Sequence, residues 1–266
     1  MSRWIAGVLL LLLATVGASI WWWRMPEPVI EPKPQPAAYL PPPCRDMVFE
    51  AVNYIVCEAD LDQYDAVLRR ADATAKPYGS LAALAKAESF VFATNAGMYH
   101  EDLSPVGLYV EDGREASPLN LGDAPGNFFM KPNGVFYVDL SGNAGVIESG
   151  AFATSGIKPV LATQSGPMLV IDGKLHPRFE ENGASRYIRN GVGTNGGKNV
   201  VFVISRQSVS LGSFARLFRD GLGIRNALFF DGAISALHDG SKYLVGGSHP
   251  AGPILAVKEK TDRPTQ

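Results

Sequence analysis

The stretch "NVVFVISRQSVSLGSFARLFRDGLGIRNALFFDG", residues 199 to 232, decides the expected fold class. Residues 199–205 form an apolar run of β-branched and aromatic side chains, which is typical of a buried strand. A helical period follows, carried by Leu211, Phe214, Phe218 and Leu222. Residues 226–230 are a second buried strand. A strand, a helix and a strand within about 30 residues predict a βαβ unit whose two strands run parallel.

The segments before this unit alternate between strand and turn signals. Residues 47–61 are expected to form one strand, residues 80–87 a short helix capped by Ser80, and residues 89–95 another strand. Three hairpins are expected over residues 106–115, 127–139 and 166–175, each around a glycine-containing turn. The fold class is therefore α+β or mixed α/β: a single domain with a mixed, hairpin-rich β-sheet and a C-terminal βαβ unit.

The N-terminal region indicates export. Residues 4–23 carry no charge, and about 20 such residues span a bilayer as a helix. A membrane anchor and a cleaved signal peptide both fit residues 1–24, and the apolar run up to Trp23 favours the anchor. Residues 25–43 form a proline-rich spacer, residues 44–258 the folded domain and residues 259–266 a flexible tail. The domain is expected in the cell envelope, on the periplasmic side of the membrane.

Charge and cysteine content narrow the function class. The net charge is −2 and the basic residues are scattered, so no nucleic-acid partner is expected. Cys44 and Cys57 both follow the export segment, and an oxidising compartment favours a disulfide between them. The spacing of the ligand-type residues demands no metal, although a divalent cation held by carboxylates is compatible with the sequence. The sequence gives no indication of the oligomeric state.

Asp231 is the first candidate for a functional carboxylate. It follows a predicted parallel strand at its carboxyl end, where ligands bind in open α/β sheets. Gly232 would let the backbone turn sharply and approach a ligand. The alternative is that Asp231 only caps the turn after the strand.

Further candidates lie in three other segments. Asn95 ends a predicted strand, and His100 nearby has an intrinsic pKa suited to acid–base chemistry. Arginines beside a glycine-rich segment suit a phosphate, because the guanidinium fork matches phosphate oxygens. The glycines there match G-x-G-x-x-G, but no strand–turn–helix context surrounds them, so a dinucleotide site is rejected. The remaining binding candidates are Ser165, Arg186, Arg189, Ser235 and His238.

These motifs together resemble the phosphodiester glycosidase family. The resemblance rests on "TNAGMYHEDLSPVGLYVEDG", "GNFFMKPNGVFYV", "ATQSGPMLVIDGKLHPRF", "SRYIRNGVG" and "FARLFRDGLGIRNALFFDGAIS", and it covers about residues 44–240. The bacterial exported branch of that family is the most similar. The family's asparagine-glycine motif falls on Asn95 to Tyr99, its Arg-x-x-Gly stretch on Arg189 to Gly193, and its Asp-Gly-Gly-x-Ser signature on Asp231 to Ser235. Ala233 replaces the second glycine of this signature.

The resemblance implies hydrolysis of a sugar-1-phosphodiester at its glycosidic bond. Arg189 would bind the phosphate, with Arg186 as a second candidate, and Asp231 would act as the base or as the carboxylate beside the sugar. His100 would protonate or hydrogen-bond the phosphate, and Asn95 and Ser235 would orient the substrate. Two alternatives stay open at this point: a membrane-tethered module that binds envelope glycans without cleaving them, and a structural envelope protein.

Overall fold

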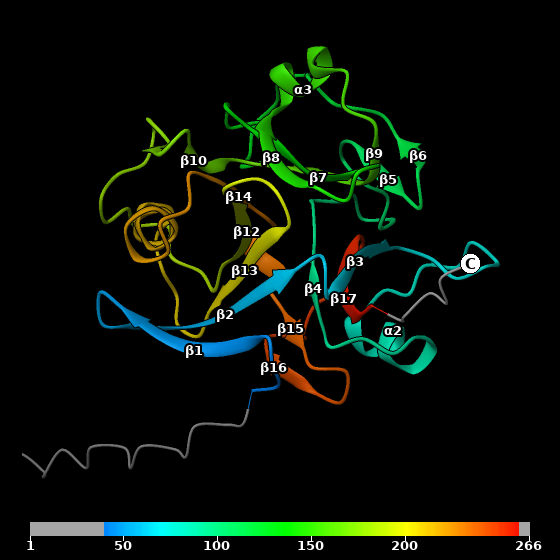
Figure 1. Ribbon diagram of the computed structural model, residues 1–266. Coiled ribbons are helices and arrows are strands. Elements are labelled where there is room, and N and C mark those ends of the chain that lie inside the picture. The colour runs from blue at the N-terminus through cyan, green and yellow to red at the C-terminus, as the bar shows by residue number, and fades with distance from the viewer. Residues whose placement is uncertain (1–39, 261–266) are drawn as a thin grey trace, which may run out of the picture. The chain divides into compact units, whose positions relative to one another are not determined.

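The computed structural model describes residues 40–260, and this part of the chain is built mainly from three β-sheets (Figure 1). The first sheet has seven strands, in the order β1 (Cys44–Phe49), β2 (Val52–Asp60), β13 (Asn199–Ser205), β12 (Asn190–Thr194), β14 (Asn226–Phe229), β10 (Met168–Ile171) and β11 (Lys174–Leu175). The second has five, in the order β16 (Tyr243–Val245), β15 (Leu237–His238), β4 (Phe92–Asn95), β17 (Ile254–Glu259) and β3 (Tyr64–Arg69). The third also has five, in the order β6 (Arg114–Ser117), β5 (Tyr109–Glu111), β9 (Pro159–Ser165), β7 (Gly134–Asp139) and β8 (Ala144–Glu148).

The helices are short. They are α2 (Leu81–Ala87), α3 (Ser149–Ser155), α4 (Leu211–Arg216), its π-helical continuation η1 (Leu217–Gly221) and the 3-10 turn η2 (Gly232–Ile234). The Ser80 hydroxyl accepts a hydrogen bond from the backbone N–H of Ala83 at 3.1 Å, as the predicted cap requires. The fold class is confirmed: a mixed, predominantly β domain with a few helices.

The central strands of the seven-stranded sheet are buried on both faces, which explains the continuous apolar run of β13. Phe202 and Ile204 of β13 face the other two sheets, whereas Val203 between them faces α4. Phe214 and Phe218 on the helix are fully buried against this second face. Strands buried on both sides lose the alternation of polar and apolar residues.

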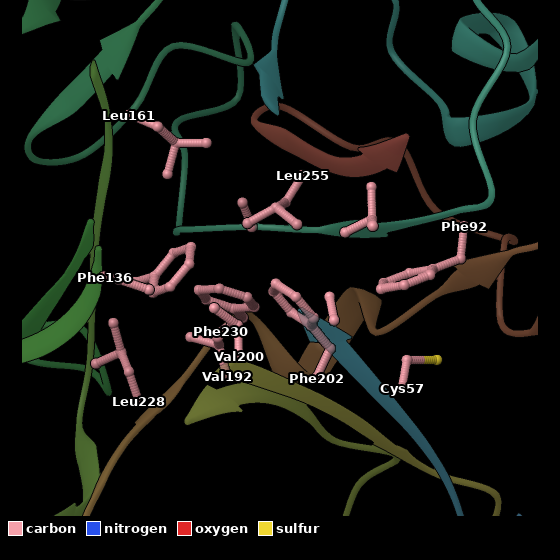
Figure 2. Packing of buried hydrophobic residues seen from close by; sticks show 14 of the residues in the cluster. Cys57, Phe92, Phe136, Leu161, Val192, Val200, Phe202, Leu228, Phe230 and Leu255 are labelled. Atoms are coloured by element: carbon pink, nitrogen blue, oxygen red, sulfur yellow. The ribbon is translucent and has the colours of Figure 1, made fainter. Parts of the chain in front are cut away.

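The main core lies where the three sheets meet. Phe202 of the first sheet contacts Phe92 of the second at a ring-centroid distance of 5.5 Å. It also contacts Phe136 of the third sheet at 6.0 Å, and both pairs cross nearly edge to face. Figure 2 shows these rings converging with Phe230 and Leu255. This shared core holds the ends of the strands at fixed positions, and the candidate site is built on those ends.

The predicted βαβ unit needs a correction in its pairing. The strands β13 and β14 do run in the same direction and are linked through α4, but β12 lies between them and is antiparallel to both. Within residues 40–260, every strand pair is antiparallel. The premise that Asp231 follows a strand of a parallel pair was therefore wrong.

Two further expectations about strands were also wrong. Residues 47–61 form two strands, because the chain turns at Glu50 and Ala51, which both have left-handed backbone angles. The segment 127–133 forms no strand, so β7 pairs with β8 and β9 and forms no hairpin with that segment. The hairpins around Gly113 and Gly173 are confirmed.

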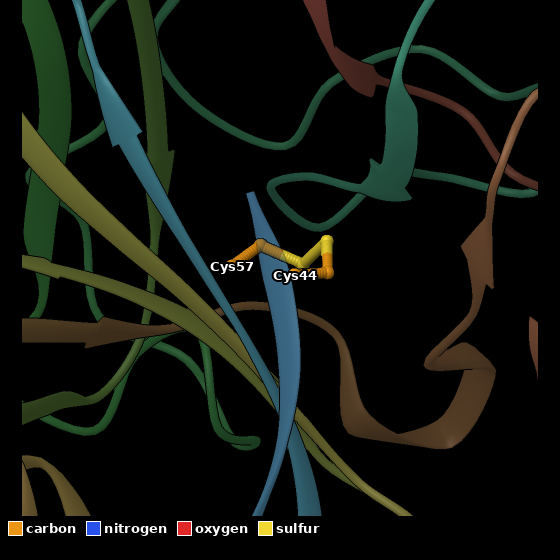
Figure 3. The surroundings of a disulfide bond; sticks show 2 residues. All are labelled: Cys44 and Cys57. Atoms are coloured by element: carbon orange, nitrogen blue, oxygen red, sulfur yellow. A yellow bond between two sulfur atoms is a disulfide. The ribbon is translucent and has the colours of Figure 1, made fainter. Parts of the chain in front are cut away.

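The disulfide between Cys44 and Cys57 is confirmed (Figure 3). The two residues are direct partners across the β1–β2 pair, so the bond ties the first strand of the domain to the second. The predicted membrane segment, residues 4–23, lies outside the described residues, as does most of the predicted spacer. From residue 40 to residue 260, no helix is long and apolar enough to cross a bilayer.

A candidate active site around Asn190 and Asp231

The site forms where the ends of interior strands of the first sheet meet the end of a central strand of the second. Asn190 begins β12, and because β12 and β14 are antiparallel, the start of β12 lies beside the end of β14. Asp231 follows that end by two residues. Asn95 is the last residue of β4 in the second sheet. Three segments that are far apart in the sequence therefore deliver polar side chains to one place.

Asn190 is a buried hub that connects these segments. Its side-chain amide Nδ2 donates to Thr94 Oγ1 at 2.8 Å, and to the backbone O and side-chain Oδ1 of Asn95 at 2.9 Å each. Its Oδ1 accepts from Ser235 Oγ at 3.0 Å and from Asn95 Nδ2 at 3.4 Å. Both polar atoms of this amide are hydrogen-bonded, as a buried amide requires.

Asn95 joins the same network to the Asp231 turn. Its Nδ2 donates to the backbone O of Asp231 at 3.1 Å, and its Oδ1 accepts from the N–H of Ala236 at 2.9 Å. The Ser235 hydroxyl lies 3.3 Å from the same Asp231 carbonyl oxygen. These bonds hold the backbone on both sides of η2, so the direction of the Asp231 side chain is fixed by its surroundings.

Asp231 has the capping role considered from the sequence. Its Oδ1 accepts from the N–H of Ala233 at 3.2 Å, so the carboxylate caps η2. Burial raises the pKa of this carboxyl above its ordinary value, and the hydrogen bond from Ala233 opposes part of that rise. A partly buried carboxyl with a raised pKa is suited to accept a proton.

Arg189 carries a buried positive charge. Its side chain is among the largest fully buried ones, and it forms no ion pair within residues 40–260. Its Nε donates to the backbone O of Val209 at 2.8 Å, and its Nη2 to that of Ser185 at 2.9 Å. Burial lowers the pKa of the guanidinium to about 10. Buried charges are normally paired, so this one is suited to a bound anion.

The free end of the guanidinium points to the Asp231 turn. Arg189 Nη1 donates no hydrogen bond within the described residues, whereas Nε and Nη2 both do. A side chain on Gly232 would bring its first carbon to 3.3 Å from Nη1 and to 2.6 Å from the ring of Phe229. Gly232 therefore allows the turn to approach Arg189 closely.

Ala233, the departure from the family signature, fits its position without strain. Its backbone is not among those with left-handed angles, and its side chain is exposed. A glycine is therefore not required there for backbone reasons.

Ser165 ends β9 with a fully buried hydroxyl that has no hydrogen-bond partner within residues 40–260. Two residues later, the backbone O of Pro167 accepts from the N–H of Phe229 at 3.2 Å. Ser165 thus lies two residues before the residue that is hydrogen-bonded to the end of β14, and Asp231 follows that strand.

The other predicted site residues are not joined to the network. His100 is exposed on a turn, and Arg186 is exposed on the segment before β12. The ring of His238 is buried instead, where its Nδ1 accepts from the N–H of Gly240 at 3.0 Å and its faces meet Phe90 and Tyr243. The structure therefore gives His238 a packing position in the second sheet.

Reasoning from sequence missed Asn190, Thr94 and Tyr99. The Tyr99 hydroxyl donates to the backbone O of Pro250 at 2.6 Å. Burial, with a smaller contribution from the charge of Asp231, raises the pKa of this phenol to about 12. A polar residue at the start of a glycine-rich apolar strand was the one available signal for Asn190.

No cluster of three or more His, Cys, Asp or Glu side chains suited to a metal ion occurs within the described range.

The chain belongs to the phosphodiester glycosidase family, whose model matches residues 88–242. That segment contains the ends of β4 and β14, the whole of β12 and the Asp231 turn. The family therefore corresponds to the part of the fold that builds the network.

Other proteins are similar in sequence or in fold. The uncharacterized protein YigE of Escherichia coli K12 is 42% identical over 159 residues, which is 59% of this chain and 59% of that protein. The zebrafish N-acetylglucosamine-1-phosphodiester alpha-N-acetylglucosaminidase catalytic domain has a similar fold, with a TM-score of 0.58, 13% identity and 82% of both chains covered. A hypothetical protein from Synechocystis also shares the fold, with a TM-score of 0.55, 14% identity and coverage of 82% of this chain and 61% of the other.

Proposed function

We propose that this protein is an exported hydrolase that cleaves the glycosidic bond of a sugar-1-phosphodiester. The observation that carries the proposal is the buried guanidinium of Arg189, which has no carboxylate partner between residues 40 and 260 and presents Nη1 to the Asp231 turn. A phosphodiester supplies a negative charge, and one of its oxygens would accept a charge-assisted hydrogen bond from Nη1.

In the proposed reaction, each of the two charged groups contacts a different part of the substrate. The phosphate lies at Arg189, and the anomeric carbon lies beside Asp231. A water oxygen bonds to the anomeric carbon while the bond from that carbon to the phosphate oxygen breaks. The electron pair of the broken bond stays on the phosphate, which leaves as a phosphomonoester, and Asp231 takes a proton from the water.

The weak basicity of the leaving phosphate explains the roles proposed for the other groups. Such a leaving group needs little protonation, so neutralising its charge matters more than supplying a strong acid. Arg189 provides that charge, and His100 is proposed to hydrogen-bond the phosphate from the turn after β4. The network of Asn95, Asn190 and Ser235 keeps the Asp231 turn in position. Ser165, from a buried position, and Arg186, from an exposed one, are proposed as further contacts to the substrate.

The proposed location is the cell envelope. The disulfide between Cys44 and Cys57 supports an oxidising compartment, where such bonds persist. The uncharged segment 4–23 supports export, and its length supports retention as a membrane anchor.

The test is to incubate the purified full chain with the methyl ester of N-acetylglucosamine 1-phosphate and to measure the free sugar released from the ester. The wild type is expected to release the sugar together with methyl phosphate. Asp231→Asn is expected to abolish release while leaving the thermal melt unchanged, because an amide keeps the acceptor for the Ala233 N–H. Asp172→Asn is the matched control, since Asp172 is exposed on a hairpin turn with a left-handed backbone that asparagine also adopts.

Turnover by Asp231→Asn would overturn the assignment of this carboxylate. Binding of the ester without cleavage by the wild type would instead support a non-hydrolysing glycan-binding protein.

A further inference from the structure

Tyr187 presents a large aromatic ring to solvent from a rigid backbone position. The residue is 53% exposed, and within the described residues it is one of few large hydrophobic side chains with that exposure. Its N–H donates to the backbone O of Val209 at 3.2 Å, and its own O accepts from the N–H of Val209 at 2.8 Å. This pair of hydrogen bonds fixes the backbone independently of the side chain.

The ring of Tyr187 lies against the guanidinium proposed to bind phosphate. The Cζ of Arg189 is 5.5 Å from the ring centroid of Tyr187 and 5.2 Å from that of Phe229. The Nε of Arg189 donates to the same Val209 carbonyl that accepts from Tyr187. The Arg189 side chain and the Tyr187 backbone are therefore both hydrogen-bonded to the Val209 carbonyl. The guanidinium lies at a distance from the Tyr187 ring that is suited to a cation–π contact.

These contacts define an order across the site. The Asp231 turn meets Arg189 at Gly232, and the guanidinium then meets the ring of Tyr187. A phosphodiester has the same linear order: the cleaved sugar, the phosphate and the second alcohol. With the sugar at Asp231 and the phosphate at Arg189, the second alcohol lies beside Tyr187.

We infer that Tyr187 is a specificity-determining platform for the group esterified on the far side of the phosphate, and that it selects alcohols that carry a ring. The inference rests on the proposed function. The face of a sugar ring or another flat apolar ring stacks on an aromatic side chain and removes apolar surface of both partners from water. An acyclic alcohol offers no such face.

The test compares two esters of N-acetylglucosamine 1-phosphate, one with methanol and one with the 6-hydroxyl of methyl glucoside. The wild-type full chain is expected to show a KM about tenfold lower for the ring ester, which is a typical contribution of one aromatic contact. Tyr187→Ala is expected to erase this preference. Because the ring also lies against Arg189, the KM is expected to rise for both esters, and to rise about tenfold more for the ring ester. Tyr187→Phe is expected to retain the preference.

Two further variants test whether the preference depends on a flat ring at position 187. One replaces the ring by an apolar side chain, and the other removes an exposed apolar side chain elsewhere. Tyr187→Leu keeps an apolar side chain without a flat face, and it is expected to lose most of the preference. Leu140→Ala removes a side chain that is 75% exposed on the turn after β7, and it is expected to leave both KM values unchanged. Equal KM values for the two esters in the wild type would overturn the inference, and so would an equal change for both esters in Tyr187→Ala.

Failure of the inference and failure of the proposed function have different signatures. If neither ester is hydrolysed, the proposed function fails, and calorimetric binding of the same esters tests the platform alone. Tighter binding of the ring ester by the wild type, lost in Tyr187→Ala, would support the platform even then. Equal binding of both esters, or binding of neither, would overturn it.

Discussion

Substituting Asn190 by aspartate tests whether its amide holds the start of β12 to the end of β4. The replacement keeps the size and shape of the side chain but turns the donor Nδ2 into an acceptor oxygen. Nδ2 donates to Thr94 and to two oxygen atoms of Asn95. Thr94 cannot compensate by reversing its hydroxyl, because that hydroxyl already donates to the backbone O of Ala236 at 2.8 Å.

The expected loss follows from the acceptors that remain. An amide has two hydrogens, so at least two buried acceptors lose their donors. A buried group left without its hydrogen bond costs about 1–3 kcal/mol, which gives a loss of about 2–6 kcal/mol at neutral pH. Domains of ordinary stability have about 5–15 kcal/mol in total, so Asn190→Asp is expected to remove a large part of the free energy of unfolding.

Urea unfolding followed by circular dichroism measures this difference. The pH dependence adds a second check, because burial raises the pKa of the new carboxyl in the folded state above its unfolded value of about 3.9. Protonation then favours folding, so the stability of the variant falls as the pH rises from the unfolded pKa through the folded one. The gap between variant and wild type should therefore be smaller at about pH 4 than at pH 7.

Asn226→Asp is the matched control for this experiment. Asn226 begins β14, and within the described residues its side chain acts only as an acceptor, from the N–H of Asp172 at 2.9 Å. A carboxylate keeps that function, so the control is expected to lose less than about 1 kcal/mol. A loss below about 1 kcal/mol for Asn190→Asp as well, or a gap that widens at low pH, would refute the role given to the Asn190 amide.

Three further outcomes are expected. Gly232→Ala should lower the free energy of unfolding by about 1–3 kcal/mol in urea titrations, because the new methyl carbon would lie 2.6 Å from the Phe229 ring, and an unchanged midpoint would contradict this contact. Replacing Cys44 and Cys57 by serine should cost up to about 3 kcal/mol for a bond that closes 13 positions, and adding reductant to this double variant should have no further effect. The pH profile of kcat/KM should fall on the acid side with a midpoint above the ordinary aspartate pKa of about 3.9, because Asp231 must be ionised to accept a proton; a profile flat down to that pH would argue against it as the base.

Local sequence signals predicted those parts of the fold that depend on local physics. The Asp-Gly turns at Gly113 and Gly173 are real because glycine adopts the left-handed conformation that such hairpins need. The turn between β1 and β2 escaped prediction because Glu50 and Ala51 adopt the same conformation without being typical turn residues. Tertiary pairing of the two strands overrides the local preference there.

The order of the strands in the first sheet could not be predicted from local sequence signals. A helix linking two buried strands indicates that they run in the same direction, which holds for β13 and β14. The insertion of β12 between them depends on which edges pair after collapse. Its sequence, "NGVGT", has little of the β-branched character that marks a strand. Its glycines are explained only by packing: Gly191 and Gly193 face the rings of Phe214 and Phe218, where larger side chains would collide.

By itself, the sequence determined the apolar strands, the cap at Ser80, two of the hairpin turns, the disulfide pair and the family, since each depends on residue types at short spacing. It also singled out Asp231 and Arg189, whose neighbours on the chain carry the family motifs. Only the tertiary structure decided that Asn190 connects Asn95 to Ser235, and that Arg189 is buried without a carboxylate partner in the part of the chain described. The physical reason is that hydrogen bonding and desolvation depend on what surrounds a side chain, and those surroundings come from segments as much as 142 residues apart.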